Sequence, residues 1–136
     1  MRALAALLFS AALAAPLAAQ GGVKWEHDLP SAMARAKAEH KPIFMDVWTE
    51  WCGWCIRLQR NTFPSAEAQA ALRDVVPLSI KTQLRDGTPT ENKAIESQFN
   101  VDGFPALFML DENGKVLRTY PGYAEPADFA AFLRGK

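Results

Sequence analysis

The segment TEWCGWCIRLQ, residues 49–59, holds both cysteines of the chain, Cys52 and Cys55, with two residues between them. It follows IFMDVW at 43–48, an apolar run whose length favours a buried strand, and it opens a stretch that we expect to be helical. At the start of a helix, unpaired backbone N–H groups and the helix dipole stabilise a thiolate. We therefore expect Cys52 to attack as the nucleophile, and Cys55, one turn further on and more shielded, to resolve the mixed disulfide.

Two other uses of the cysteine pair stay open at this point. A purely structural disulfide across so short a loop would constrain the unfolded chain little, because the gain grows with loop length. A zinc site could recruit the two histidines, His27 and His40, but they lie far apart and lack the close spacing of zinc-finger ligands. We expect a redox-active pair, no metal, and no cofactor beyond the cysteines themselves.

Residues 1–19 have the composition of a secretory signal peptide. Arg2 provides a basic start, an apolar run continues to about Ala15, and small residues end the segment. The run is shorter than the about 20 apolar residues that span a membrane. We expect cleavage within a few residues of Ala19 and a periplasmic or otherwise exported location, with an uncleaved anchor as the alternative. Such a compartment is oxidising, so the two cysteines would normally form a disulfide.

Residues 24–136 are expected to form one domain. The chain carries 15 basic and 15 acidic residues, a formal net charge of zero, without a basic block. This balance argues against nucleic acid or an anionic membrane surface as partner. No repeat or linker divides the segment. We expect a monomer with no membrane span after cleavage.

The remaining chain alternates between helix and strand signals. TPTE at 88–91 combines an N-cap threonine, a proline at the first helical position and a capping-box glutamate, which predicts a helix from there to about Phe99. Alternating β-branched and apolar runs predict strands, and DENG between two of them predicts a hairpin turn. The expected order is a helix between 28 and 42, strand 43–48, helix 52–62, helix 65–75, strand 75–84, helix 88–99, strands 105–110 and 115–120, and helix 125–136. This order indicates an α/β sheet with helices on both faces and one antiparallel hairpin.

Asp46 lies inside the apolar run 43–48, where a carboxylate is costly to bury unless it has a function. Buried beneath the disulfide, it would have a raised pKa and could exchange a proton with Cys55. The alternative is a strand register that turns Asp46 to solvent.

Together these motifs resemble the thioredoxin superfamily over roughly residues 24–134. MDVWTEWCGWC at 45–55 is similar to its active-site strand and helix start, and GFPALFMLDENGKV at 103–116 to its cis-proline strand and hairpin. WCGWCIRLQRNTFPSAEAQAAL at 51–72 looks most like the C-terminal periplasmic domain of DsbD and related small exported thioredoxin-like proteins.

The resemblance implies a thioredoxin-like fold, a central mixed sheet with helices on both faces, and the activity of a thiol–disulfide oxidoreductase. In the family pattern Cys52 attacks, Cys55 resolves and Asp46 assists proton transfer. Phe104 and Pro105 would form the groove for the partner peptide, with Pro105 as the cis-proline. Pro105 follows Phe104 directly before an apolar strand, which is compatible with a cis bond, although spacing does not establish one.

The sequence departs from thioredoxin at two positions beside the sulfurs. Trp54, after Gly53, replaces the proline of the Cys-Gly-Pro-Cys motif, and Phe104 replaces a threonine or valine. Trp48, Trp51 and Trp54 could form an aromatic rim for docking. The alternative is that Trp48 belongs to the core and only Trp51 is exposed.

The residues near Cys52 favour the reducing or isomerising direction. Gly53 and Trp54 bring no positive charge, and Glu50 would oppose a thiolate, whereas a strong oxidant stabilises its reduced form. We expect oxidised exported proteins or apocytochromes as substrates and a membrane thiol reductase as electron donor. The alternatives are a disulfide-introducing oxidant of the same fold, and a non-catalytic peptide-binding or chaperone module with a closed disulfide.

Overall fold

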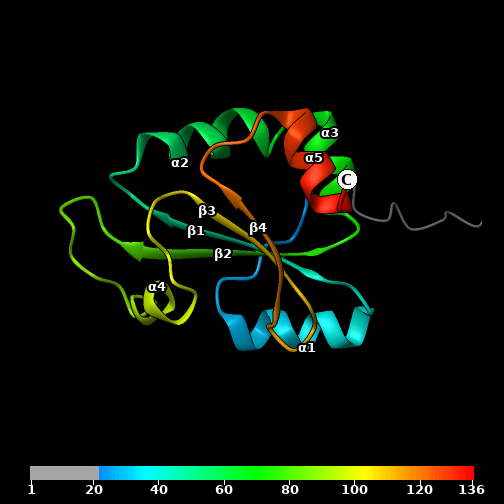
Figure 1. The fold of residues 1–136 in the computed structure, drawn as a ribbon, viewed down its shortest axis with the longest axis horizontal. Helices are drawn as coiled ribbons and strands as arrows, with labels where there is room; N and C mark the ends of the chain where they lie inside the picture. The colour runs from blue at the N-terminus through cyan, green and yellow to red at the C-terminus, as the bar shows by residue number, and fades with distance from the viewer. Residues whose placement is uncertain (1–21) are drawn as a thin grey trace, which may run out of the picture.

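The computed structural model describes residues 22–136 (Figure 1), so the expected signal peptide at 1–19 lies outside the described residues. The elements follow one another as α1 (Leu29–Glu39), β1 (Ile43–Thr49), α2 (Gly53–Arg57), the π-helix η1 (Leu58–Thr62), α3 (Ala66–Leu72), β2 (Val76–Gln83), α4 (Ala94–Gln98), β3 (Ala106–Leu110), β4 (Val116–Pro121) and α5 (Pro126–Arg134).

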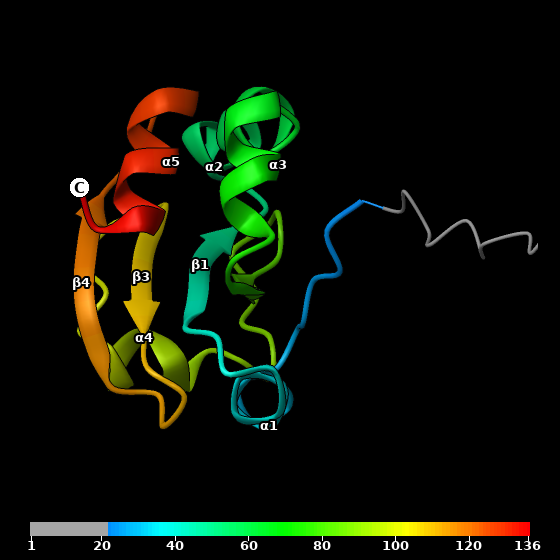
Figure 2. The ribbon, with the colours of Figure 1, turned by 90° about the vertical axis from the view of Figure 1, so that its right-hand side faces the viewer.

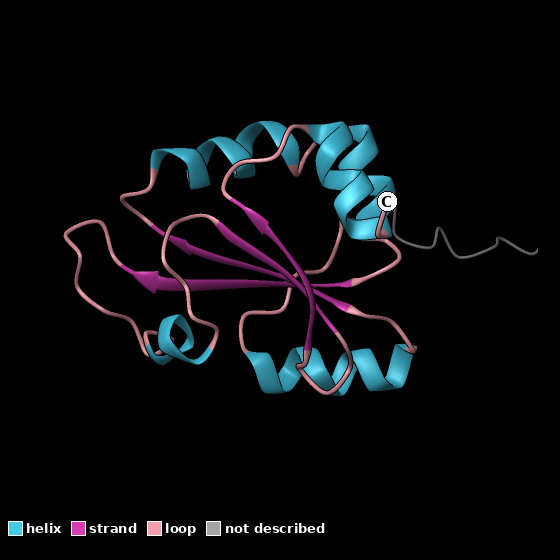
Figure 3. Ribbon diagram, in the orientation of Figure 1, coloured by secondary structure: helices cyan, strands magenta, loops and turns pink. Residues whose placement is uncertain are grey.

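Four strands within the described residues form one mixed sheet in the order β2-β1-β3-β4. β1 pairs in parallel with β2 and antiparallel with β3, and β3 and β4 form the hairpin. Helices α1 and α4 lie on one face of the sheet, and α2, α3 and α5 lie on the other (Figures 2 and 3). The expected α/β architecture with helices on both faces is confirmed.

Side-chain alternation along β1 divides the core into two layers. Ile43, Met45 and Val47 belong to the apolar cluster that includes residues of α1, whereas Phe44 belongs to the cluster that includes residues of α3 and α5. Successive side chains of a strand point to opposite faces, so Asp46 shares the face of Phe44. That is the face covered by the helix that carries Cys55.

The segment from the cysteine pair to Thr62 is helical, as expected, but its second half widens into a π-helix. The Phe63 N–H donates to the carbonyl of Leu58 at 3.0 Å, which closes a five-residue turn. The Thr62 hydroxyl then donates to the carbonyl of Ala124 at 2.7 Å, joining the end of η1 to the loop before α5. This bond fixes the loop that borders the cysteine pair.

The helix expected from Thr88 is wrong in its start, because α4 begins only at Ala94. The backbone N–H of Thr90 donates to the Thr82 carbonyl at 2.9 Å, and its hydroxyl donates to the Lys81 carbonyl at 2.6 Å. The carbonyl of Thr88, the expected cap, accepts from the Leu84 N–H at 2.8 Å, so the segment 88–90 is bridged to the end of β2 and does not begin a helix. The capping pattern in the sequence is therefore overridden by hydrogen bonds to β2, a tertiary contact.

Candidate active site

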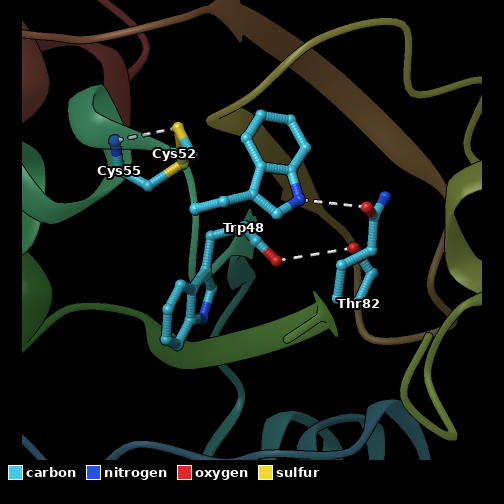
Figure 4. The surroundings of a disulfide bond; sticks show 6 residues. Trp48, Cys52, Cys55 and Thr82 are labelled. Carbon is cyan, nitrogen blue, oxygen red and sulfur yellow. Dashed lines mark hydrogen bonds between the residues drawn. A yellow bond between two sulfur atoms is a disulfide. The ribbon is translucent and has the colours of Figure 1, made fainter. Parts of the chain in front are cut away.

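The cysteine pair lies directly after β1, at the start of α2. Cys52 and Cys55 are joined by a disulfide with their Cα atoms 5.3 Å apart. Cys52 is the N-cap of α2, and its Sγ accepts a hydrogen bond from the backbone N–H of Cys55 at 3.1 Å (Figure 4). A sulfur in this position faces a free backbone donor at a helix N-terminus, the arrangement that stabilises a thiolate after reduction.

The two sulfur-bearing residues differ in access. Cys52 is 6% exposed and Cys55 is completely buried. Only the Cys52 side of the disulfide can be approached from solvent, while Cys55 is enclosed by the protein. The geometry therefore separates an outer cysteine from an inner one.

Asp46 is completely buried on the sheet face beneath α2, which excludes the solvent-facing alternative. Its neighbours across the sheet are Leu107 on β3 and Ser79 on β2. Neither carboxylate oxygen has a hydrogen-bond partner among residues 22–136. Burial raises the pKa of this carboxyl from 3.8 to about 8. A carboxyl with such a pKa can both accept and release a proton near neutral pH.

Glu50, between Asp46 and the cysteines in sequence, has the opposite environment. It accepts a hydrogen bond from the Lys81 ammonium and another from the backbone N–H of Arg85 at 3.0 Å. The hydrogen bond from Lys81 is the main cause that lowers the pKa of Glu50. Because Lys81 compensates its charge, Glu50 repels a Cys52 thiolate less than its position in the sequence suggests.

Two of the three tryptophans between residues 48 and 54 form the rim around Cys52. Trp51 is 50% exposed and Trp54 is 56% exposed. Trp48 is partly buried on β1, where its indole N–H donates to the Ser79 hydroxyl at 2.9 Å. Its carbonyl accepts from the Thr82 hydroxyl at 3.4 Å (Figure 4). The structure matches neither alternative from the sequence in full. Trp48 is partly buried and does not belong to a three-tryptophan rim, but Trp54 is exposed as well as Trp51.

A small groove lies beside Trp54, two residues after the outer cysteine in the chain. It has a volume of about 380 Å³ and is lined by Trp54, Phe104, Gly122 and Tyr123. A second hollow of about 470 Å³ continues along the segment that includes Phe104 and Pro105. The peptide bond between these two residues is cis. Gly53, at the first position of α2, has no atom within 4 Å of an added Cβ, so the backbone there is open to a partner.

Several residues of the site were not singled out from sequence. Tyr123 comes from the loop before α5, and its ring lies 5.5 Å from that of Trp54, with the Arg57 guanidinium over both rings. Gln83 and Lys81, at the end of β2, bind Trp51 and Glu50. These residues lie far from the cysteines in sequence, and no local pattern marks them.

The histidines lie away from the disulfide pair. His27 borders a separate hollow with Trp25 and Trp48, and His40 ends α1 in the left-handed conformation. Among residues 22–136 no group of three or more His, Cys, Asp or Glu side chains is placed to hold a metal ion.

Comparison with known proteins places the chain in a family. Residues 29–135 match the family model described as a thioredoxin-like domain. The chain belongs to the thioredoxin-like family. It is 32% identical over 124 residues to the disulfide bond reductase DsbH of Chlamydia pneumoniae, covering 87% of this chain and 72% of that protein. The expected membership of the thioredoxin superfamily is thereby confirmed.

DsbD proteins are also related to this thioredoxin-like chain. It is 31% identical over 114 residues to the thiol:disulfide interchange protein DsbD of Pseudoalteromonas atlantica, covering 82% of this chain but only 19% of DsbD. The chain thus spans about a fifth of the length of this relative. The oxidised C-terminal domain of Neisseria meningitidis DsbD superposes with a TM-score of 0.67 at 23% identity, covering 82% of this chain and 98% of that domain, which supports the fold.

The named relatives are thiol–disulfide oxidoreductases, and this thioredoxin-like chain is their homologue. The Cys52–Cys55 pair is present with the spacing that this chemistry uses. Within residues 22–136, no helix has both the length and the apolar character required to cross a bilayer.

Proposed function

We propose that this protein is an exported thiol–disulfide oxidoreductase that works in the reducing or isomerising direction through Cys52 and Cys55. The observation that supports this most directly is the position of Cys52. It caps α2, its sulfur accepts the Cys55 N–H at 3.1 Å, and it is the more accessible of the two cysteines. A structural disulfide would not require this difference in access.

The reaction is a pair of sulfur displacements. In the reduced enzyme the Cys52 thiolate attacks a partner disulfide, forms a Cys52–partner disulfide and releases one partner thiolate, which takes a proton. The Cys55 thiolate then attacks the Cys52 sulfur and releases the second partner thiol. The partner gains two electrons, and the enzyme is left with the Cys52–Cys55 disulfide that the structure contains.

Asp46 is assigned the proton transfer in the second displacement. Cys55 must lose its proton before it attacks, and it is fully buried, so water is a poor acceptor there. The Asp46 carboxyl lies on the sheet face beneath α2, with a pKa raised to about 8 by burial. It would accept the proton from Cys55 and return it to the leaving partner thiolate, which is released as the thiol.

The groove beside Trp54 is assigned to the partner segment. Trp51, Gly53 and Trp54 would form the part nearest the sulfur, and Phe104 and Pro105 the part beyond it. Support comes from the exposure of both tryptophans and from the hollow that Trp54 and Phe104 line.

The direction is proposed from the residues around Cys52 and from the related reductase. Gly53 and Trp54 bring no charge, and the printed name of the Chlamydia pneumoniae relative is disulfide bond reductase. We propose oxidised exported proteins or apocytochromes as substrates and a membrane thiol reductase as electron donor. The protein would act as a periplasmic or otherwise exported monomer after removal of residues 1–19.

Reduction of insulin disulfides by dithiothreitol, with and without the protein, tests the activity. We expect the wild type to accelerate insulin reduction and Cys52→Ser to have no effect above background.

Equilibration with glutathione buffers tests the direction of electron transfer. We expect a midpoint nearer the about −270 mV of thioredoxin than the about −120 mV of DsbA. A midpoint above about −150 mV would make the protein an oxidant, and an inert wild type would favour a binding module.

A further inference from the structure

We propose that Gln83 is a positioning residue that holds the Trp51 indole against Phe104, so that these two rings form a fixed docking wall for an extended, cystine-containing segment of the partner protein. This inference rests on the proposed function and names a determinant of partner binding within it. Gln83 is on β2, far from the cysteines in the sequence, and does not touch the reacting sulfurs in the contacts described above.

The Trp51 indole is held from two sides although half of it is exposed. Its ring meets that of Phe104 edge to face, with centroids 5.6 Å apart and an angle of 86°. Its indole N–H donates to Gln83 Oε1 at 3.0 Å. A half-exposed tryptophan without such a bond could exchange rotamers in water, whereas this one is held in a single orientation.

The chemistry of its neighbours permits only one orientation of the Gln83 amide. Gln83 Nε2 donates to Glu96 Oε1 at 2.9 Å, and the other oxygen of Glu96 accepts from the Lys93 ammonium. Burial disfavours the ionised form of Glu96, but hydrogen bonds from Lys93 and Gln83 outweigh it and lower the pKa of this carboxyl. An ionised carboxylate can only accept and an indole N–H can only donate. Glu96 therefore turns the amide oxygen of Gln83 toward Trp51.

The other exposed tryptophan near Cys52, Trp54, lacks such a fixed contact. The Trp54 ring packs at a tilt of 42° against that of Tyr123, with centroids 5.5 Å apart, and the Arg57 guanidinium lies 5.5 Å from the Trp54 centroid. Among the described residues its indole N–H has no hydrogen-bond partner. Trp51 is thus fixed by a hydrogen bond as well as a ring contact, whereas Trp54 is held by a ring contact and a cation–π contact alone.

The access to Cys52 explains why the occupant is an extended segment. Cys52 is 6% exposed, while Trp51 before it and Trp54 shortly after it in the chain are each about half exposed, so a partner that reaches its sulfur meets these rings. A cystine on an extended segment can do so while its neighbouring residues lie against Trp51 and Phe104. A wall that is already ordered loses no rotamer freedom on binding, which favours affinity.

Steady-state kinetics of Gln83→Leu test the proposal. With a cystine-containing peptide as substrate we expect KM to rise about 2- to 10-fold, the usual effect of losing one hydrogen bond, and kcat to stay nearly constant. With 2-hydroxyethyl disulfide, which is too small to reach along the wall, we expect no change. Gln69→Leu is the matched control, because Gln69 also donates a side-chain bond, to the Phe63 carbonyl, away from the Trp51 wall. It should leave both KM values unchanged.

A second variant removes the same bond from the other side. Trp51→Phe keeps an aromatic ring without the donor, and adding Gln83→Leu to it should raise KM no further. An unchanged peptide KM in Gln83→Leu, or an equal increase in both backgrounds, would overturn the proposal. Exchange protection of the Trp51 indole N–H, measured by NMR, should also fall in Gln83→Leu. This readout needs no activity, so an inert wild type would contradict the proposed function while retained protection in Gln83→Leu would contradict the role of Gln83.

Discussion

Asp46 and Glu50 are two carboxyl groups four positions apart on the chain, and the fold gives them opposite properties. Asp46 points into the layer beneath α2, fully buried and without a hydrogen-bond partner among the described residues, and its pKa rises to about 8. Glu50 lies at the open end of the same strand, bonded to Lys81 and to a backbone N–H, and its pKa is lowered.

The same division runs through the cysteine pair. Cys55 belongs with Asp46 to the inner half of the site, which is closed to solvent, whereas Cys52 belongs with Glu50 to the outer half. The inner half is suited to moving a proton, because a buried carboxyl with a pKa of about 8 can both accept and release one near neutral pH. The outer half is suited to meeting a partner, because its charge is compensated and its sulfur faces the helix N-terminus.

Replacing each cysteine by serine should have the largest effect on activity and should distinguish the inner from the outer half of the site most clearly. We expect Cys55→Ser to accumulate a mixed disulfide with substrate, because the outer sulfur can attack but nothing resolves the product. Cys52→Ser should trap none, because the inner sulfur is enclosed. Non-reducing gel electrophoresis after incubation with an oxidised substrate measures this. Equal trapping by both variants would remove the distinction between inner and outer cysteine.

Asp46→Asn should produce the next largest effect, on activity. We expect insulin reduction to slow by about 100-fold or more, in the range attributed to general acid–base groups, while the protein stays folded. The wild-type pH–rate profile should contain an ionisation near the Asp46 pKa of about 8, and the variant should lack it. Turnover that is equal in the two proteins across this pH range would contradict a proton-transfer role.

Stability should respond to Asp46 with a definite sign. Between its ordinary pKa of 3.8 and the folded-state pKa of about 8, the folded protein keeps a proton that the unfolded chain releases. The free energy of unfolding should therefore fall as pH rises, by up to about 1.4 kcal/mol per pH unit, with the full stability present below about pH 4. We expect Asp46→Asn to remove this slope and to be more stable than wild type at about pH 8. Urea denaturation of both proteins at the two ends of this pH window measures the difference in their free energies of unfolding. An equal pH dependence of this free energy in wild type and variant would contradict the role of Asp46 burial.

Thr62→Val should have a moderate effect on the contact between the helix and the loop. The substitution keeps the shape of a fully buried side chain but removes the hydrogen bond to the Ala124 carbonyl. We expect a loss of about 1–2 kcal/mol in the free energy of unfolding. Thr119→Val, at an exposed position on β4, is the matched control and should have little effect. Equal losses for both variants would show that the buried hydrogen bond is not the cause.

Glu50→Gln should have the smallest effect. It removes a negative charge two positions before Cys52 but also releases Lys81, which then adds uncompensated positive charge nearby. We expect iodoacetamide to alkylate Cys52 in the reduced variant slightly faster at neutral pH, by less than about 5-fold, because exposed ion pairs are weak. Raising the salt concentration should shrink the difference. A large, salt-independent change would mean that Glu50 is coupled to the sulfur more strongly than the outer half of the site allows.

Local signals in the sequence were sufficient for most of the fold. The Cys52–Cys55 spacing after an apolar strand, the helix start at Ser65 and the hairpin turn at 111–114 each depend on neighbouring residues, and the structure contains all three. The expected helix start at Thr88 failed because the decisive partners of Thr90 are carbonyls of β2, which no window around it contains.

The sequence by itself determined the cysteine spacing, the alternation of strands and helices and the family, because these follow from short-range spacing and from motifs. Only the tertiary structure decided that Asp46 is inside while Glu50 is neutralised by Lys81, since burial and ion pairing depend on which elements pack together. For the same reason Gln83 could not be recognised in advance. Its bond to Trp51 exists only because β2 lies beside β1 in the sheet and ends next to the cysteine pair.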